Sequence, residues 1–410
     1  MAVDNLTTGE GGLVADVYGE HTISGHLIYN ALGTMATVLG EGVWDSVVKI
    51  WYRGGELTSD QYHFHPGTIS NGTTDPVQGV DSWLPGGGTY SRTCYLVARP
   101  TTEPDLDPSQ LIGRYRGRLV PDFDATGNQT GSDYSANPAR VLIGLLIIGA
   151  KLPSERIDWQ SWYNWKIYCD TPIEWNDGKS VRQIKRFEAH QAFTGPTSPV
   201  DVLNQLTDMS ATLWQDDGEL IRFFPVESRS SVTTIDRSKI LRGTFSHAPL
   251  DIREQPTRCV IGFRDLDSEF LAPASWTQKD EPGIDERGVI DVGTFSFGAM
   301  HYSQAQRLAK YWLARAQSTE RFTVTVTGSE LAILPGDLVT LDFPPALSEP
   351  VLCHVQATED VPEGADNRVL YLAPWTAKYS DQDHEAIPAK IATETTSTLI
   401  VPTVEMPIAA

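Results

Sequence analysis

The stretch Asn137-Pro-Ala-Arg-Val-Leu-Ile-Gly-Leu-Leu-Ile-Ile-Gly-Ala150 is the clearest helical signal in the chain, and it divides a β-rich beginning from a mixed middle. Asn137 suits an N-cap because its side-chain oxygen can accept a hydrogen bond from an unpaired backbone N–H. Pro138 suits the first helical position, where no N–H is needed. The residues that follow are apolar on nearly every side. We therefore predict a buried helix over residues 139–148.

Three further helices are predicted from residues that recur at three- and four-residue spacing. One begins at Asp158 and carries Trp159, Trp162, Tyr163, Lys166 and Ile167. Another begins at Ser198-Pro199 and ends near Trp214, with one face formed by Val202, Leu203, Leu206, Met209 and Leu213. The last begins at Ser303, with an apolar stripe of Ala305, Leu308, Ala309, Tyr311, Trp312 and Ala316, and with Arg307, Lys310 and Arg315 outside.

The remaining segments indicate strands and turns. Short apolar or alternating runs at residues 46–52, 62–65 and 93–98 are broken by Gly and Pro. The turn Asp216-Asp217-Gly218 leads into a hairpin strand at 219–225. Later strands are expected at 321–327 and, after the turn Leu334-Pro-Gly-Asp337, at 338–343, and no helix is predicted from there to residue 410.

Two stretches lack a regular pattern. The loop between Gly67 and Gly88 is rich in Gly, Asp and Thr. Long loops of this kind are typically functional surfaces or disordered tips, and we predict an interaction loop. Residues 121–137 are expected to be a low-order connection between the first β region and the first helix.

The composition is that of a folded protein with an acidic surface. Hydrophobic residues make up 40% and charged residues 21% of the chain, which is atypical of disorder, and 410 residues exceed what a single core accommodates. The net charge of −21 argues against a nucleic-acid-binding surface, because such surfaces need clustered Lys and Arg. An acidic channel wall would instead let DNA slide past without sticking.

Three further sequence features indicate the cellular compartment in which the protein folds. The longest apolar run, residues 141–150, is about half the roughly 20 residues that span a bilayer. Residues 1–12 are polar and acidic, so we expect no secretory signal. We therefore expect that the protein is made and folds in the cytoplasm. The four cysteines form no CxxC pair, and we predict buried free thiols at Cys94, Cys169, Cys259 and Cys353.

Two segments resemble metal sites. Tyr62-His63-Phe64-His65-Pro66 places two imidazoles on one face of a strand, but no third ligand follows by spacing, so histidines facing a polar neighbour are favoured over a metal site.

In the loop 122–133, the first, third, fifth, sixth and twelfth positions of an EF-hand are matched by Asp122, Asp124, Thr126, Gly127 and Asp133. The last of these is shorter than the usual Glu and no helix precedes the loop. An Asx-turn loop with weak or no calcium binding is therefore favoured.

Catalytic motifs are missing from the sequence. There is no GxSxG, HExxH, Walker or dinucleotide fingerprint, and Gly86-Gly87-Gly88 lacks the Lys and Ser/Thr of a phosphate loop, which makes it a flexible turn. The Trp-rich region 159–175 could form a sugar-binding platform, but its helical spacing favours a core position. No catalytic, cofactor-binding or metal-binding residue is predicted, and we expect that the protein is not an enzyme.

Several segments, in order, resemble the tail-tip attachment protein J family of long-tailed phages and, more distantly, the hubs of contractile baseplates and gene transfer agents. In the first half these are Gly40-Glu-Gly42, residues 46–52, Phe64-His-Pro-Gly67, Tyr90-Ser-Arg-Thr-Cys-Tyr-Leu-Val97 and Asn137-Pro-Ala-Arg-Val-Leu142. In the second half they are Ile157-Asp158-Trp159, Tyr168-Cys169-Asp170, residues 199–218, residues 304–314 and Leu334-Pro-Gly-Asp-Leu-Val339. Together they cover residues 40–343. Many such proteins continue into receptor-binding modules, whereas this sequence ends at Ala410.

The resemblance implies an α+β, β-rich multidomain fold in which two β-barrel-like hub domains flank an α+β middle. The expected domains are an N-terminal β-rich hub domain at 1–136, a middle domain at 137–230, a β/α region with a long helix at 231–325, and a C-terminal β-barrel-like hub domain at 326–410. The implied function is a homotrimeric ring at the distal tail tip of a virion, which closes the tube until DNA is ejected.

The same resemblance implies the partners. They are further copies of the chain, the distal tail protein, the tape measure protein, and a tail fibre or receptor-binding protein, with indirect contact to the host envelope. DNA would pass through the lumen without specific binding, and no cofactor is expected.

A carbohydrate-binding or glycoside-hydrolase protein is the alternative, because it too is commonly β-rich, acidic and rich in Trp. Such an enzyme needs two carboxylates across a cleft, and the sequence alone does not distinguish that pair from a solvated acidic face.

Overall fold

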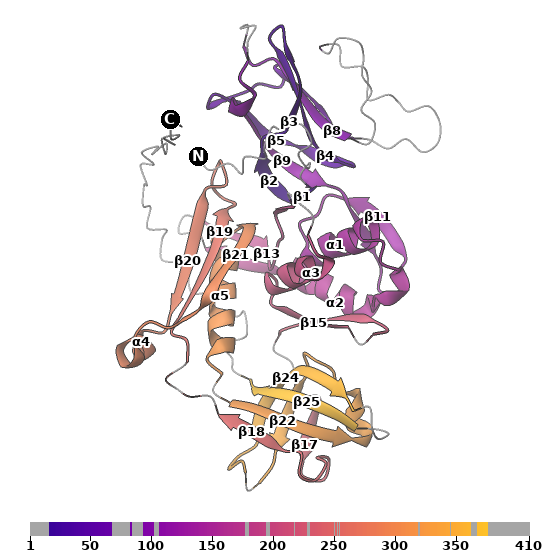
Figure 1. Cartoon of the computed structure of the whole chain (residues 1–410), viewed down its shortest axis with the longest axis vertical. Helices are drawn as coiled ribbons and strands as arrows, with labels where there is room; N and C mark the ends of the chain where they lie inside the picture. Colours follow the sequence, from indigo (N-terminus) through magenta and orange to yellow (C-terminus); the bar gives the residue numbers. More distant parts are fainter. Residues whose placement is uncertain are drawn as a thin grey trace, which may run out of the picture.

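The computed structural model describes residues 16–375 except for 68–82, 84–92, 102–105, 177–179, 194–196, 217, 228–229, 250, 252, 254, 319, 345 and 362–366. The two ends of the described chain are β-sheets, and most of the helical residues lie between them (Figure 1). The β-rich fold with helices that the sequence predicts is therefore confirmed. No helix in these described ranges is long and apolar enough to cross a membrane.

The N-terminal unit consists of two four-stranded antiparallel sheets. One has the order β2 (Glu20–Ile23), β9 (Leu111–Arg118), β5 (Trp44–Tyr52) and β6 (Gly55–Glu56), and the other β3 (His26–Ala31), β4 (Thr34–Glu41), β8 (Thr93–Ala98) and β7 (Tyr62–His65). Side chains from both sheets share one core, which includes Ile50, Tyr115, Met35 and Leu96. Burial alternates along β9, because successive residues of a strand face opposite sides of the sheet. The strands predicted at 46–52, 62–65 and 93–98 are confirmed.

The middle unit begins with a hairpin of β10 (Val120–Phe123) and β11 (Gln129–Asp133), so the expectation of a low-order stretch at 121–137 was wrong. Asn137 caps α1 (Pro138–Ile143), as predicted, but the segment Gly144–Gly149 continues as a π-helix. Its end turns toward solvent: Ile148 is 44% exposed, so the apolar run is buried only in part.

Two other helices of the middle unit differ in detail from the prediction. α2 (Trp159–Asp170) begins after Asp158 as expected, but its buried face is Trp162, Trp165, Tyr168 and Cys169, and Ile167 is exposed. α3 (Pro199–Asp208) begins after the Ser198 cap and ends six residues before Trp214. Leu213 and Trp214 belong instead to β15 (Thr212–Asp216), which forms a hairpin with β16 (Ile221–Pro225).

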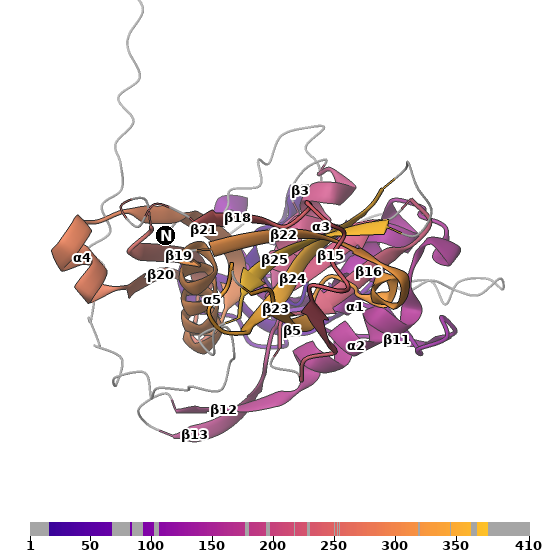
Figure 2. The same cartoon turned by 90° about the horizontal axis from the view of Figure 1, so that it is seen from below.

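Two strand pairs extend the middle unit. β12 (Pro172–Asn176) and β13 (Val181–Lys185) form a hairpin that projects from the molecule in Figure 2. β14 (Gln191–Phe193) pairs with β1 (Asp16–Tyr18), so the start of the described chain is tied to the middle unit.

A three-stranded sheet follows, with the order β20 (Pro273–Lys279), β19 (Arg258–Asp265) and β21 (Asp291–Met300); the short α4 (Glu281–Arg287) connects β20 to β21. α5 (Tyr302–Ala316) packs on this sheet, where Trp312 stacks on Phe295 with ring centroids 4.8 Å apart. One core cluster contains Trp162 and Leu206 from the middle unit and Phe263 and Leu308 from this unit. The two units therefore pack as a single body.

The prediction that Arg307 lies on the outer face of α5 was wrong. The Arg307 side chain is buried, its guanidinium donates a hydrogen bond to the Arg186 carbonyl, and it lies over the Phe187 ring at 4.8 Å. A buried guanidinium is tolerated here because a backbone acceptor and an aromatic face receive it.

The C-terminal unit is a six-stranded sheet. Its order is β17 (Thr233–Asp236), β23 (Leu338–Asp342), β24 (Val351–Asp360), β25 (Asn367–Pro374), β22 (Glu320–Thr327) and β18 (Ser246–Pro249). β17 pairs with β23 in parallel, and the other pairs are antiparallel. β22 spans residue 325, so the sheet takes strands from both sides of the boundary expected at 325/326.

Candidate functional site

The residues that resemble an EF-hand lie on the β10–β11 hairpin, and the loop is closed by its own hydrogen bonds. Asp124 Oδ1 accepts hydrogen bonds from the Thr126 backbone N–H at 2.9 Å, the Thr126 hydroxyl at 2.7 Å and the Asn128 backbone N–H at 3.0 Å. Bonds from Thr126 and then from Asn128 hold the pKa of Asp124 well below its usual range. This pattern is an Asx-turn, as predicted from the sequence.

The other two carboxylates of this loop are bound by cations. Lys166 Nζ lies 2.5 Å from Asp122 Oδ1, and Arg140 forms an ion pair with Asp133. Among the described residues there is no group of three His, Cys, Asp or Glu side chains that could hold a metal ion. The hairpin therefore presents internal ion pairs where the EF-hand pattern would require ligands that converge on one cation.

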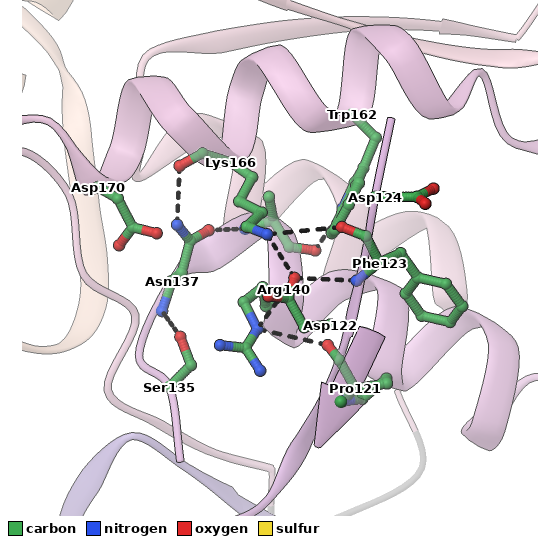
Figure 3. A network of polar contacts seen from close by, with 12 residues as sticks. Pro121, Asp122, Phe123, Asp124, Ser135, Asn137, Arg140, Trp162, Lys166 and Asp170 are labelled. Carbon is green, nitrogen blue, oxygen red and sulfur yellow. Dashed lines mark hydrogen bonds and ion pairs between the residues drawn. The ribbon is translucent and has the colours of Figure 1, made fainter. Parts of the chain in front are cut away.

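Arg140, Asn137 and Lys166 form the centre of a buried polar network that joins the hairpin to α1 and α2 (Figure 3). The Arg140 guanidinium donates to the Val120 carbonyl at 3.0 Å and lies 3.7 Å from Asp122. Asn137 Oδ1 accepts from the Ala139 N–H at 2.9 Å, and its Nδ2 donates to the Lys166 carbonyl at 2.9 Å. These bonds fix the relative positions of three elements, which is a structural role.

The sequence reasoning did not identify this network. Arg140 stands alone in an apolar run, and Lys166 was assigned only to a helical stripe. A charge inside a predicted buried helix requires a partner, and the nearby Asp122 and Asp133 supply it. That rule is the signal in the sequence that could have led to the network.

The two histidines of β7 lie beside aromatic rings. His63 stacks on Trp83 with ring centroids 3.8 Å apart, and His65 stacks on Tyr95 at 4.2 Å. Each of the two rings therefore has an aromatic neighbour. Within the described part of the chain, no third ligand joins the two histidines in a group that could hold a metal ion.

The cysteines behave as predicted. Cys94, Cys169, Cys259 and Cys353 are all free and buried. Burial raises the pKa of Cys259 and of Cys353 to about 12, so both are thiols rather than reactive thiolates near neutral pH.

Three of the aromatic residues of α2, Trp162, Trp165 and Tyr168, are core residues. Trp162 and Trp165 are 0% exposed, and Trp165 stacks on Phe223 with ring centroids 4.9 Å apart. A sugar-binding platform needs exposed rings, so these two residues do not provide one.

A small cavity of about 10 Å³, room for one water molecule, is lined by Leu213, Val226, Tyr311, Arg315, His354 and Gln356.

The turn before β23 has the predicted geometry. Gly336 has φ +87°, and the Asp337 N–H donates to the Leu334 carbonyl at 3.2 Å. This places glycine at the third residue of a type II turn. Leu338, Val339 and Leu341 are all buried, as expected. A Cβ on Gly336 would lie 2.6 Å from Cβ of Phe224, so the turn packs against β16 of the middle unit.

The predicted interaction loop between Gly67 and Gly88 lies outside the described residues except for Gly67 and Trp83. The turn Gly86-Gly87-Gly88 also lies outside them.

Comparisons with known proteins support a tail-type fold. A family model, Phage-tail_3, described as "Putative phage tail protein", matches residues 198–346. No curated protein sequence matches the chain. A chain of a solved structure, "Virion of native gene transfer agent (GTA) particle", is similar over 94% of this chain and 90% of that chain, with a TM-score of 0.65 and 16% identity.

Two solved tail proteins are more distant. One is from Neisseria meningitidis MC58, with 10% identity, 90% of this chain and 97% of that chain covered, and a TM-score of 0.35. The other is the prophage MuSo2 43 kDa tail protein from Shewanella oneidensis, with 9% identity, coverages of 88% and 98%, and a TM-score of 0.35. The fold assignment rests on the GTA chain: this chain has the fold of a GTA virion protein and carries a region similar to phage tail proteins.

Proposed function

We propose that the chain is a structural hub subunit of a phage-type tail tip. In this proposal three copies form a ring that closes the distal tail tube, binds the distal tail ring and the tape measure protein, and opens when DNA is ejected. The observation that carries the proposal is the shared fold with a GTA virion chain over nearly the whole length, together with the family match at 198–346.

The two β-rich ends support the ring. In the proposal the N-terminal sheets and the six-stranded sheet each act as a barrel-like hub domain, so three subunits would contribute six such domains. Edge strands offer unpaired backbone groups to a neighbouring subunit. The edge strand β3 also carries Leu27 and Ile28 at 38% and 37% exposure, which is apolar surface that a neighbouring copy could cover.

Charge supports the passage of DNA without binding. A net charge of −21 argues against a cationic surface that would bind DNA phosphates and release their counterions. A lumen lined by this chain would instead repel a polyanion weakly along its length. The proposal includes no catalytic site, and it leaves receptor binding to a tail fibre or another receptor-binding protein.

Light scattering on the purified full-length chain and imaging of the intact particle test this function. We expect a species of three times the 45.2 kDa chain mass and a threefold ring at the distal end of the tail. A chain that stays monomeric and is absent from the tail tip would contradict the proposal. So would glycan hydrolysis that is lost on replacing a single Asp or Glu.

A further inference from the structure

The strand β20 forms an edge of the three-stranded sheet that is open along one side. It pairs with β19 over its whole length, from Pro273 to Lys279, without a bulge. Among the residues that the structure describes, no strand pairs with its other side. Figure 1 shows β20 on the side of this sheet away from the middle unit. The backbone N–H and C=O groups along this edge can therefore receive an added strand.

β20 lacks the features that usually protect an edge strand, which are charges, bulges and short length. Residues 274–278, in the interior of the strand, carry no charge. The opposite edge strand, β21, is protected, because it shifts register twice against β19 and its Ala299 pairs with His190 of the middle unit. The other edge strands of the described sheets are shorter than β20. β20 is thus the longest regular open edge in the described part of the chain.

The side chains of β20 alternate between an outer face and a face toward α5. Ala274 and Trp276 pack against the core cluster that contains Leu308 and Ala309 of α5. The outer face is exposed and mostly polar, and it consists of Pro273, Ser275, Thr277 and Lys279. A strand added beside β20 therefore needs polar side chains at every second position, where it continues the outer face.

The C-terminal sequence contains a segment with this character. Residues 376–410 lie outside the described part of the chain. Within them, residues 392–401 read Ala-Thr-Glu-Thr-Thr-Ser-Thr-Leu-Ile-Val, which is rich in β-branched residues and contains neither Gly nor Pro. Such a composition favours a strand. Residues 1–15 and 68–92 are interrupted by several glycines, so they suit a strand less well.

One antiparallel register of residues 392–401 complements the outer face of β20. It forms one pair of opposite charge and two pairs of hydroxyl side chains: Glu394 with Lys279, Thr396 with Thr277, and Thr398 with Ser275. Both kinds of cross-strand pair stabilise antiparallel strands. A shift of two residues in either direction would place an uncharged residue opposite Lys279. Charge complementarity therefore selects this register.

The chain between the described fold and this segment is long enough to reach a neighbouring copy. Trp375, the last described residue, packs against the same core cluster as Trp276. Residues 376–391 follow, and they can span up to about 55 Å when extended. In a ring, each copy joins one of its surfaces to a different surface of the next copy. An open edge and a strand-forming segment are such an unlike pair.

We propose that residues 392–401 of one copy add as an antiparallel strand to the open edge of β20 in the next copy. This inference rests on the proposed ring and names one of the contacts that close it. Each copy gives one strand and receives one, so the three-stranded sheet of every subunit becomes a four-stranded sheet that contains two chains.

Disulfide trapping in the full-length chain tests the pairing. The test variant carries Thr277→Cys and Thr396→Cys, because residues directly opposite in antiparallel strands have Cα atoms about 4.5–5.5 Å apart, within the range of a disulfide. The four natural cysteines are buried and free. After mild oxidation we expect a denaturing, non-reducing gel to show linked chains up to three times the 45.2 kDa chain mass.

The matched control carries Thr294→Cys with Thr396→Cys. Thr294 is exposed and lies level with Thr277 across β19, but on the opposite edge strand, so this variant should stay at the mass of one chain. A disulfide of the test variant that forms within a single chain would overturn the proposal. So would a test variant that forms the ring by light scattering but yields no linked chains, a result that leaves the proposed function intact. Absence of any ring would contradict both.

A chain that ends at Ile391 provides an independent test, because it lacks the added strand and keeps every described residue. Its far-ultraviolet circular dichroism should match that of the full-length chain. The protein concentration at which half of the chains are assembled should rise at least about tenfold, which corresponds to the loss of about one net hydrogen bond. An unchanged assembly concentration would overturn the proposal.

Discussion

At the scale of single residues, Gly336 combines two demands that only glycine meets. Its φ of +87° is unfavourable for a β-branched residue, at about 1–3 kcal/mol. In addition, a Cβ there would press on Phe224, and overpacking typically costs about 1–3 kcal/mol more. We predict that Gly336→Val lowers the melting temperature strongly, and that assembly of the proposed ring fails at temperatures where the variant is still folded.

The control for this prediction is Gly218→Val. Gly218 has φ +88°, nearly the same backbone strain, but no described atom lies within 4 Å of its Cβ position. Thermal unfolding of the two variants therefore separates strain from packing. If both variants lose the same stability, the contact between the 334–337 turn and β16 contributes nothing.

At the scale of elements, Asn137 does more than cap a helix. It is 0% exposed, it caps α1, and it also bonds the carbonyl of Lys166 in α2. Asn137→Ala leaves buried groups of two elements without partners, and we predict a loss of about 2–4 kcal/mol in the free energy of unfolding. Ser198→Ala removes an exposed cap that also precedes a helix-starting proline, and should cost about 0.5–1 kcal/mol. Urea unfolding of both variants measures the difference, and equal losses would contradict the linking role of Asn137.

The starts of three helices could be predicted from sequence, and their ends less well, whereas α4 was not predicted at all. Asn137, Asp158 and Ser198 each accept a hydrogen bond from the first turn of a helix, which is a local property of the residue. The end of α3 is different. Ala211 adopts φ +47° after the helix, and Leu213 falls by chance on the continued helical stripe, although it belongs to β15. Spacing alone cannot separate these two cases.

The sequence also did not predict the positions of side chains that contact segments far away in the chain. Arg307 is buried because the Arg186 carbonyl and the Phe187 ring receive it, and both are far away in the sequence. The same is true of the network of Arg140 and Lys166. The Asx-turn at Asp124 could be predicted, because the Asp and Gly residues that form such a turn are local features of the sequence.

At the scale of the whole molecule, Asp208 links stability to pH. It lies at the end of α3, and burial raises its pKa to about 6, with Arg315 of α5 opposing the shift. The folded state therefore binds this proton more tightly than the unfolded chain. The stabilisation of the folded state by the proton on Asp208 is fully present below the ordinary pKa of 3.8 and is lost as pH rises through about 6.

Asp208→Asn removes the cost of the buried charge. We predict that it raises the free energy of unfolding by about 1–3 kcal/mol at pH 7, and that the gain shrinks steadily toward pH 4. Chemical denaturation at several pH values measures this. The control Asp201→Asn changes an exposed carboxylate in the first turn of the same helix and should give no such gain. A gain at pH 7 that persists at pH 4 would contradict the cause given for the shift.

The arrangement of two β-rich ends around a mixed middle was predictable, because it follows from local periodicity. Which strands form the six-stranded sheet could not be predicted from the sequence. β17 and β18 come before the three-stranded unit in the chain, and their partners β23 and β22 come after it. Nothing in the short runs 233–236 and 246–249 indicates partners so far along the sequence.

This interrupted sheet has a consequence for synthesis on the ribosome. β17 ends at Asp236, and its partner β23 begins at Leu338, so the intervening residues must be translated before the two can pair. At about 5–20 residues per second this takes about 5–20 seconds. During that interval β17 remains an open edge on a nascent chain, available to the same segment on a neighbouring ribosome of one polysome. For this fold the time of greatest exposure to wrong pairing lies during translation, before the subunit is complete.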